Sequence, residues 1–556
     1  MYLYFEGYHY PKNAEIREVC KHVAYSEVEA KAKVKFLSVG YYFSCDKQDS
    51  VFILPKVFIV NGKAFGDYIP EEISLVSSEQ NPLREKGHDK FIFGLSVWIY
   101  QAIRHFKQRN PDTSIAETAL IQSTYSAAGE DSATFLDTIL ALKDFHKKNR
   151  NLFTSISIIN NVGNDKINWT KTINRIQPVI KGNTPYYTEF KNKNKVINLD
   201  EELIVLFYSV LGYLQHQYRF DLKSDVRYKL LPPSKIESML QFGMGTRLLR
   251  KIRKNYFSTV LVQLWKLLFA FFEKAEQIES RKFREEVLLT HNFNLIFEDM
   301  IDQLIGSEKG TLPSELKNQA DGKIVDHIYK DRSLIDENDI YFVGDSKYYK
   351  TDSGLGNTSI YKQFTYAKNI IQYNIDVLHG YGHHKTEGFK ALNYRDDLTE
   401  GYNITPNFFI RGMIYPDKLT YAEDLLESKG KDATIVNKHF DNRLFDRDTL
   451  IINEYNINFL YVLSAYVLAT ESTVEKEHLR QAFRKDLIET LNSHYKFFIV
   501  TPTEDIKKYV DKHFRDYAGK MYRWSENKIL IAFEKGTVPK NIPEDAVWEE
   551  WEIGKS

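Results

Sequence analysis

The sequence predicts a multidomain α+β protein, and three observations point to this fold class. The chain has 556 residues, which is more than one ordinary domain holds. Hydrophobic residues make up 43% of it and aromatic residues 14%, so packed cores are expected rather than disorder. Apolar residues recur first with strand-like and later with helix-like spacing. We expect a β-rich module over 1–75, a mainly helical region over 76–274, and an α/β core (a mixed sheet flanked by helices) with a helical C-terminal extension over 275–556.

The first module is predicted to be β-rich because two apolar runs flank a polar connection. The runs cover 35–43 and 50–60, and the residues between them are polar, which predicts a hairpin. Asn61-Gly62 is a further turn signal. From residue 91 onward, apolar residues recur three and four positions apart, which indicates helices.

Charge and cysteine content limit the kind of protein that this chain can be. Lys+Arg and Asp+Glu are both 75, so bulk charge would not hold the chain on nucleic acid, although a local basic face could. Cys20 and Cys45 allow at most one disulfide, which favours the cytoplasm. The most apolar window, 260–272, is interrupted by Gln263 and Lys266 and is shorter than the roughly 20 residues of a spanning helix. We expect no membrane segment and no secretory signal.

The stretch 340–349 carries the strongest chemical signal. Residues 340–343 are apolar and strand-like, and Asp345 and Lys347 follow them. Because positions i and i+2 of a strand point to the same side, both side chains should project together from the end of a buried strand. Asp-x-Lys is half of the metal-dependent nuclease signature PD-(D/E)xK. The tripeptide alone is more often a solvated face, so its surroundings decide the interpretation.

A second acid is expected to lie across from Asp345. The apolar run 323–329 carries Asp326 at its centre, and the polar residues that follow it are typical of a turn. The two runs can therefore form a hairpin that places Asp326 opposite Asp345. Carboxylates that close repel each other unless a divalent cation lies between them.

Two predicted helices bring further polar residues to the same place. The segment 292–305 has a helical apolar stripe with Glu298 at its edge. The segment 360–371 is also helical and places Lys362 and Gln363 side by side. We predict Lys362 to contact DNA.

These elements predict a metal-dependent phosphodiester hydrolase. Glu298, Asp326 and Asp345 are the predicted ligands of Mg²⁺ or Mn²⁺, which would polarise the phosphate and acidify a water molecule. Lys347 would lie beside the nucleophile and stabilise the developing negative charge. Gln363 would help to orient the water or the DNA backbone.

A basic cluster precedes this core in the sequence. It comprises Arg247, Arg250, Lys251, Arg253 and Lys254. A basic helix face is usually only solvated, but next to a nuclease core it could follow a phosphate backbone. We therefore predict that these cations bind DNA.

Two other motifs keep open interpretations. Trp169 is equally consistent with packing at a domain surface and with contact to a substrate or partner. His379, His383 and His384 crowd together, but no cysteine or acid completes a zinc pattern, which favours a loop.

The core motifs resemble the nuclease subunit of McrBC-type restriction systems, in particular the LlaJI-like branch. The specific matches are Phe297-Glu298-Asp299, Val325-Asp326, Gly344 to Tyr349, and Lys362-Gln363-x-x-Tyr366. Weaker matches are Val39 to Tyr42, Phe52 to Lys56 and Lys166 to Ile173, so that the resemblance covers most of 35–370. Val325 stands where the superfamily motif has proline, a position at which proline is commonly lost.

The resemblance implies an Mg²⁺-dependent endonuclease subunit of a prokaryotic defence system with a restriction-endonuclease-like core. It implies double-stranded DNA as substrate, a separate McrB-like AAA+ GTPase or ATPase, docking through the N-terminal half, and possible pairing of two nuclease domains on DNA. The chain itself has no G-x-x-x-x-G-K-[ST] motif. Two alternatives remain: a self-sufficient restriction or repair endonuclease with its own recognition domain, and a catalytically inactive scaffold.

Overall fold

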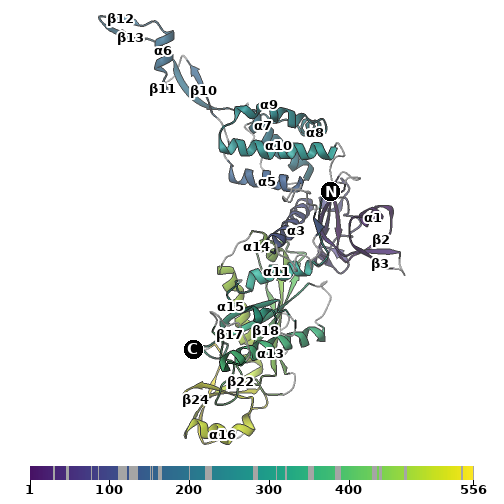
Figure 1. The fold of residues 1–556 in the computed structure, drawn as a ribbon, viewed down its shortest axis with the longest axis vertical. Coiled ribbons are helices and arrows are strands. Elements are labelled where there is room, and N and C mark those ends of the chain that lie inside the picture. Colours follow the sequence, from purple (N-terminus) through teal and green to yellow (C-terminus); the bar gives the residue numbers. More distant parts are fainter. Residues whose placement is uncertain are drawn as a thin grey trace.

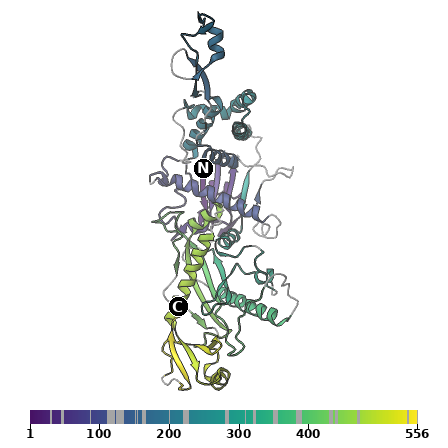
Figure 2. The same ribbon diagram turned by 90° about the vertical axis from the view of Figure 1, so that its left-hand side faces the viewer.

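The structure is a computed structural model in which part of the chain is described. The described residues are 1–28, 32–44, 49–76, 78–85, 87–110, 122–123, 135–150, 152, 155–160, 166–198, 201–218, 228–279, 286–308, 310–319, 322, 324–348, 356–381, 390–428, 435–437, 441–468, 473–539 and 543–554. The molecule is elongated, with a narrow arm at one end and the C-terminal extension at the other (Figures 1 and 2). The mixed α+β class predicted from the sequence is confirmed.

The N-terminal module is built on one five-stranded sheet. Its order is β1 (Tyr2–Phe5), β6 (Asp49–Leu54), β5 (Val39–Ser44), β15 (Val287–Thr290) and β9 (Gln122–Ser123). The predicted hairpin is confirmed, because β5 and β6 pair in antiparallel fashion. Asn61 and Gly62 adopt φ angles of +51° and +76° between two short strands, β7 (Ile59–Val60) and β8 (Lys63–Ala64), as the turn signal predicted. A smaller sheet joins β2 (His9–Pro11), β4 (Lys33–Phe36) and β3 (Tyr25–Val28), beside α1 (Ala14–Val19).

The position of β15 corrects the predicted domain boundary. We expected the C-terminal core to begin at residue 275, but β15 pairs with β5 of the N-terminal sheet. A sequence pattern reveals a strand but not its partner, and this strand completes a sheet begun more than 240 residues earlier, as the pairing of Val287 with Tyr42 shows. The C-terminal core therefore starts after Thr290.

The middle region is helical as predicted, with two exceptions. Its helices are α2 (Pro82–Glu85), α3 (Asp89–Arg109), α5 (Phe135–Lys148), α7 (Glu202–Tyr218), α8 (Pro233–Gln241), α9 (Met244–Ile252) and α10 (Thr259–Glu279). One exception is β9, which pairs with β15 in the N-terminal sheet. The other is the arm, which lies between α5 and α7 in the sequence and projects beyond the helices (Figure 1). No helix in the described ranges is long and apolar enough to cross a membrane.

The arm is a β structure that ends in exposed apolar side chains. It comprises β10 (Ser155–Asn160), β11 (Lys166–Ile167), α6 (Trp169–Arg175), β12 (Val179–Lys181), β13 (Thr184–Tyr186) and β14 (Asn192–Ile197). Trp169 is 52% exposed and Ile180 71% exposed. The ring of Trp169 also packs edge-on against Tyr187 and Phe190, so the tryptophan is both packed and accessible.

The C-terminal core contains the predicted mixed sheet. The strands are ordered β16 (His327–Arg332), β17 (Asp339–Lys347), β18 (Pro406–Met413), β21 (Thr449–Asn458) and β19 (Glu427–Ser428), and β20 (Ile435–Asn437) also pairs with β21. The hairpin of β16 and β17 is antiparallel, as predicted. By contrast β17, β18 and β21 run parallel, so their carboxyl ends meet at one edge.

Helices cover both faces of this sheet. They are α11 (Phe293–Ile305), α12 (Ser314–Lys317), α13 (Asn357–His379), α14 (Phe459–Leu468) and α15 (Thr473–His494). The predicted apolar stripe of α11 is buried throughout. Phe297 of this helix lies against Gly412 of β18, where an added Cβ would come within 2.9 Å of the ring. On the other face, α13 packs against β17 through Gln363.

The C-terminal extension is only partly helical. Besides α15 and α16 (Ile506–Tyr517), it contains a four-stranded sheet ordered β23 (Met521–Ser525), β24 (Lys528–Glu534), β22 (Tyr495–Pro502) and β25 (Ala546–Trp551). The edge strand β25, with the sequence AVWEEW, is acidic and aromatic. Helical periodicity in α15 and α16 was visible in the sequence, whereas β22, which lies between these helices, and the three strands that follow α16 were not predicted.

Candidate active site

Asp345 and Lys347 lie where the sequence predicted, at the carboxyl end of β17. Asp345 is 2% exposed and Lys347 9% exposed, and the ammonium group of Lys347 donates to the Asp345 carboxylate. Lys347 Nζ also lies 5.3 Å from the ring centroid of Phe409 on β18. Two buried groups of opposite charge thus project together from the edge of a parallel sheet, which is where such sheets bind ligands.

Asp326 and Asp345 are a pair of facing carboxyl groups. The register pairs His327 with Gly344, so Asp326, one residue before β16, lies across from Asp345. The backbone N–H of Ser346 donates to Asp326 Oδ2 at 3.2 Å. Burial, then the hydrogen bond and charge of Asp345, raise the pKa of Asp326 well above its usual range. Burial acts in the same direction on Asp345, but the hydrogen bond from Asp326 and the charge of Lys347 outweigh it and lower the pKa of Asp345.

Glu298 reaches the same pair from α11. Burial raises its pKa to about 7, the hydrogen bond from Asn294 opposes this rise, and the charge of Asp345 adds to it. Without a cation, the three acids therefore cannot all be ionised at neutral pH.

This gives a testable pH dependence in metal-free protein. The folded protein holds a proton on Glu298 up to about pH 7, whereas the unfolded chain releases it near 4.5. The free energy of unfolding that this proton contributes is fully present below the pKa of the unfolded chain, and it is lost as the pH rises through the pKa of the folded protein. In EDTA, the melting temperature should fall across this interval in wild-type protein and fall less in Glu298→Gln. Parallel curves for the two proteins would contradict the assignment.

Lys362 and Gln363 lie near the start of α13 but face different surroundings. Burial lowers the pKa of Lys362, but a hydrogen bond with Tyr366 and the charges of Asp326 and Asp345 raise it on balance. Lys362 is exposed, so it can meet a ligand above the acids. Gln363 is fully buried, and its amide nitrogen donates to Val343 O at 2.9 Å and to Asn407 Oδ1 at 3.1 Å. These hydrogen bonds connect α13 to β17 and β18, so Gln363 holds the helix against the sheet.

A buried polar network, which the sequence analysis did not identify, supports β17 on the face of the sheet opposite Asp345 and Lys347. His327 Nε2 is hydrogen-bonded to the hydroxyl of Ser346, the residue between Asp345 and Lys347. The other ring nitrogen lies 3.5 Å from Asp302 Oδ1, and Asp302 also accepts from Lys317 at 2.6 Å. The histidine is fully buried. In the sequence it had no visible partner, because the residues it contacts lie 25 and 19 positions away.

A contact from the N-terminal module reaches the residue after Lys347. The hydroxyl of Tyr348 is hydrogen-bonded to the Glu6 carboxylate and accepts from the backbone N–H of Lys56 at 3.1 Å. The Lys56 ammonium group lies 4.4 Å from the centre of the same ring. Burial raises the pKa of Glu6, while the charge of Lys56 opposes this. The carboxyl end of β17 is thus anchored by residues of the N-terminal module.

The structure does not bring the predicted basic cluster to this site. Arg247, Arg250 and Lys251 are on α9, and Arg253 and Lys254 follow in a 3-10 turn. Figure 1 places α9 at the far side of the helical region, beyond α3 from β17. The guanidinium groups of Arg250 and Arg253 lie 5.5 Å and 5.1 Å from the rings of Phe269 and Trp265, so part of the cluster covers aromatic surface.

The histidine cluster can be placed only in part. His379 is the last residue of α13. His383 and His384 lie outside the described residues.

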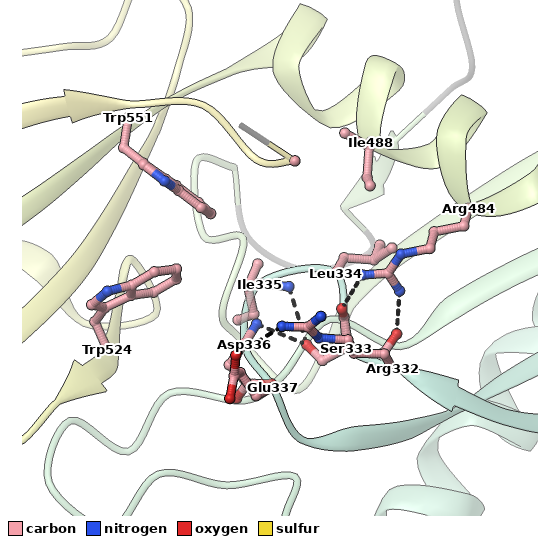
Figure 3. Close-up of a pocket in the computed structure, with 11 residues that line it drawn as sticks. Arg332, Ser333, Leu334, Ile335, Asp336, Glu337, Arg484, Ile488, Trp524 and Trp551 are labelled. Atoms are coloured by element: carbon pink, nitrogen blue, oxygen red, sulfur yellow. Dashed lines mark hydrogen bonds and ion pairs between the residues drawn. The ribbon is translucent and has the colours of Figure 1, made fainter. Parts of the chain in front are cut away.

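A separate pocket lies at the opposite end of the β16–β17 hairpin (Figure 3). Its volume is about 830 Å³, and Trp524 and Trp551 face its interior from the C-terminal extension. Arg484 closes another side by donating to the main-chain carbonyls of Arg332 and Ser333. The pocket adjoins the turn of the hairpin, whereas Asp345 lies near the far end of β17, roughly 20 Å away at about 3.3 Å per residue.

The acidic residues fit the divalent cation that the sequence predicts. In the described ranges, no three His, Cys, Asp or Glu side chains form a preassembled metal-binding group. Mg²⁺, however, usually takes only one or two protein carboxylates and keeps several waters. Asp326 and Asp345 suit it, because a cation between these two close carboxylates would offset their mutual repulsion.

A comparison with known protein families identifies the family of this chain. A sequence model of the LlaJI restriction endonuclease family matches residues 83–390, more than half of the chain. The chain belongs to this family, as its motifs predicted.

Comparisons with curated proteins and with solved structures do not identify a closer relative. No curated protein matches the sequence. Among solved structures, a chain of the "Refined half-complex from tetradecameric assembly of Thermococcus gammatolerans McrB AAA+ hexamers with bound McrC" is 12% identical with a TM-score of 0.26, covering 87% of this chain and 98% of that chain. A likeness this remote does not define the fold.

Proposed function

We propose that this protein is the metal-dependent endodeoxyribonuclease subunit of a restriction system and hydrolyses phosphodiester bonds of double-stranded DNA. The observation that carries the proposal is the convergence of Asp326, Asp345 and Lys347 at the carboxyl edge of the sheet. Membership of the LlaJI restriction endonuclease family supports it.

The residues would divide the chemistry between them. A Mg²⁺ or Mn²⁺ ion held by Asp326 and Asp345, with Glu298 at its edge, would polarise the scissile phosphate and lower the pKa of a nearby water molecule. Lys347 would exchange its hydrogen bond to Asp345 for one to the attacking water or the phosphate, where its charge offsets the developing negative charge. Lys362, exposed above the acids, would contact a neighbouring phosphate.

Gln363 is assigned a supporting role. Its amide nitrogen already makes two hydrogen bonds to the sheet, and its Oε1 atom is buried without a partner among the described residues. The side chain would therefore hold α13, and with it Lys362, over the acids.

We further propose that a separate AAA+ GTPase or ATPase drives the reaction and docks on the N-terminal half. The chain lacks a P-loop motif, so it would not hydrolyse nucleotide by that route. The arm supports docking, because Trp169, Ile173, Val179, Ile180 and Tyr186 are exposed apolar residues on a projecting element.

Plasmid cleavage with Mg²⁺ tests both proposals. The purified protein is assayed alone, with a candidate McrB-like AAA+ protein, and with that protein plus nucleotide. We expect cleavage only in the complete mixture, and we expect Ile180→Asp to lose this stimulation while keeping the wild-type melting temperature, because the side chain is exposed.

The other outcomes separate the alternatives. Metal-dependent cleavage by the chain alone would identify a self-sufficient restriction or repair enzyme and remove the need for a motor. Absence of cleavage in every mixture, with DNA binding retained, would favour a catalytically inactive scaffold.

A further inference from the structure

Arg411 lies beside Lys347 on the neighbouring strand. The parallel pairing of β17 and β18 matches Lys347 with Arg411 and Asp345 with Phe409. Neighbouring strands are roughly 4.8 Å apart, so the two cationic residues start from adjacent backbone positions. Arg411 is near the carboxyl end of β18, at the same sheet edge as Asp345.

Arg411 also faces the same side of the sheet as the acidic site. Asn407 of β18 accepts a hydrogen bond from Gln363 of α13, and Phe409 lies beneath the Lys347 ammonium group. Because side chains alternate along a strand, Arg411 follows Asn407 and Phe409 on that face. Lys347 and Arg411 therefore form a row of two cations across the sheet.

The guanidinium group of Arg411 is buried but incompletely paired. The residue is only 5% exposed, and its Nη2 atom is buried without a hydrogen-bond partner in the described part of the chain. A buried cation is normally paired with an acid or with several acceptors, because its loss of hydration is otherwise uncompensated. Arg480 shows the ordinary arrangement, since it donates to the carbonyls of Ile305 and Gly306 and stacks on Tyr329.

We propose that Arg411 is a catalytic residue that binds the scissile phosphate of DNA. This inference rests on the proposed nuclease function and adds a residue that the Asp-x-Lys motif does not contain. A phosphodiester is the anionic partner that the buried guanidinium group lacks. Its planar donors match two phosphate oxygens at once, whereas Lys347 offers a single charged centre. Arg411 would fix the phosphate while Lys347 faces the attacking water.

The test compares two arginine variants in the full-length protein, with its AAA+ partner where cleavage requires it. We expect Arg411→Met to reduce kcat by about 10²-fold or more, as loss of a donor to the reacting group does. Its melting temperature should stay at or above that of wild type, because an unpaired buried charge is removed. The control Arg480→Met should lower the melting temperature, because buried carbonyls lose their donor.

Two further readouts exclude a merely structural role. Added guanidinium, well below unfolding concentrations, should restore part of the activity of Arg411→Ala but not that of Asp345→Asn. In the Asp345→Asn background, which does not cut, Arg411→Met should reduce the salt dependence of binding to a duplex by about one phosphate contact.

The outcomes distinguish this inference from the function on which it rests. Wild-type kcat and an unchanged salt dependence in Arg411→Met would overturn the role of Arg411 while leaving the nuclease intact. If wild-type protein cuts no DNA in any mixture, the proposed function fails, and the salt dependence alone decides whether Arg411 binds phosphate.

Discussion

Asp345→Asn is expected to reduce Mg²⁺-dependent plasmid cleavage by about 10³-fold and to lower the melting temperature while the protein stays folded. The carboxylate is the centre of the site, since it lies across from Asp326 and accepts from Lys347. An amide of the same shape removes the negative charge that would attract the cation and leaves the Lys347 ammonium group without its counter-charge. Initial rates of plasmid nicking and linearisation, beside a thermal melt, measure both effects.

Asp339→Asn is the matched control for that experiment. Asp339 begins the same strand, at the end far from the site, and is paired with Lys330 at 3.0 Å on the surface. An exposed ion pair of this kind contributes little to stability, so cleavage and melting temperature should both match wild type. Equal activity of Asp345→Asn and Asp339→Asn would refute the proposed catalytic site.

Gly344→Ala is expected to destabilise the C-terminal core by about 3 kcal/mol, near the upper end for overpacking. An added Cβ would lie 2.1 Å from the Phe408 ring, which also stacks on Phe483 of α15 and so cannot easily move away. Because Gly344 precedes Asp345, the backbone shift that relieves the clash would also displace the site. Thermal and urea unfolding measure the loss.

Gly212→Ala provides the comparison. Gly212 lies within α7, and nothing is within 4 Å of the position that a Cβ would take there. Alanine favours a helix over glycine by roughly 1 kcal/mol, so this variant should equal or exceed wild-type stability. A destabilisation as large as that of Gly344→Ala would show that the steric argument is wrong.

The sequence predicted local elements of the site well because each is a short segment with its own pattern. The β16–β17 hairpin, the buried stripe of α11 and the helix carrying Lys362 and Gln363 all follow from apolar spacing within a few residues. The placement of Asp326 opposite Asp345 followed from the hairpin alone.

What could not be predicted depends on contacts between distant segments. Arg411 has no motif and becomes notable only when the pairing of β18 with β17 sets it beside Lys347. The same holds for two other features: β15 joins the N-terminal sheet, and α9 lies far from the acids. Both depend on the three-dimensional path of the chain, which the periodicity of apolar residues does not reveal.

The bond between Glu6 and Tyr348 has a consequence for how the protein is made. It joins residues 342 positions apart, so this hydrogen bond cannot form until β17 and the following Tyr348 have been synthesised. Contacts of such long range make folding slow, because the chain between them must be closed before they form. Until then the Glu6 carboxylate lacks its hydrogen bond from the Tyr348 hydroxyl. The N-terminal module would therefore leave the ribosome with this surface uncovered, and the second half of the chain would cover it later.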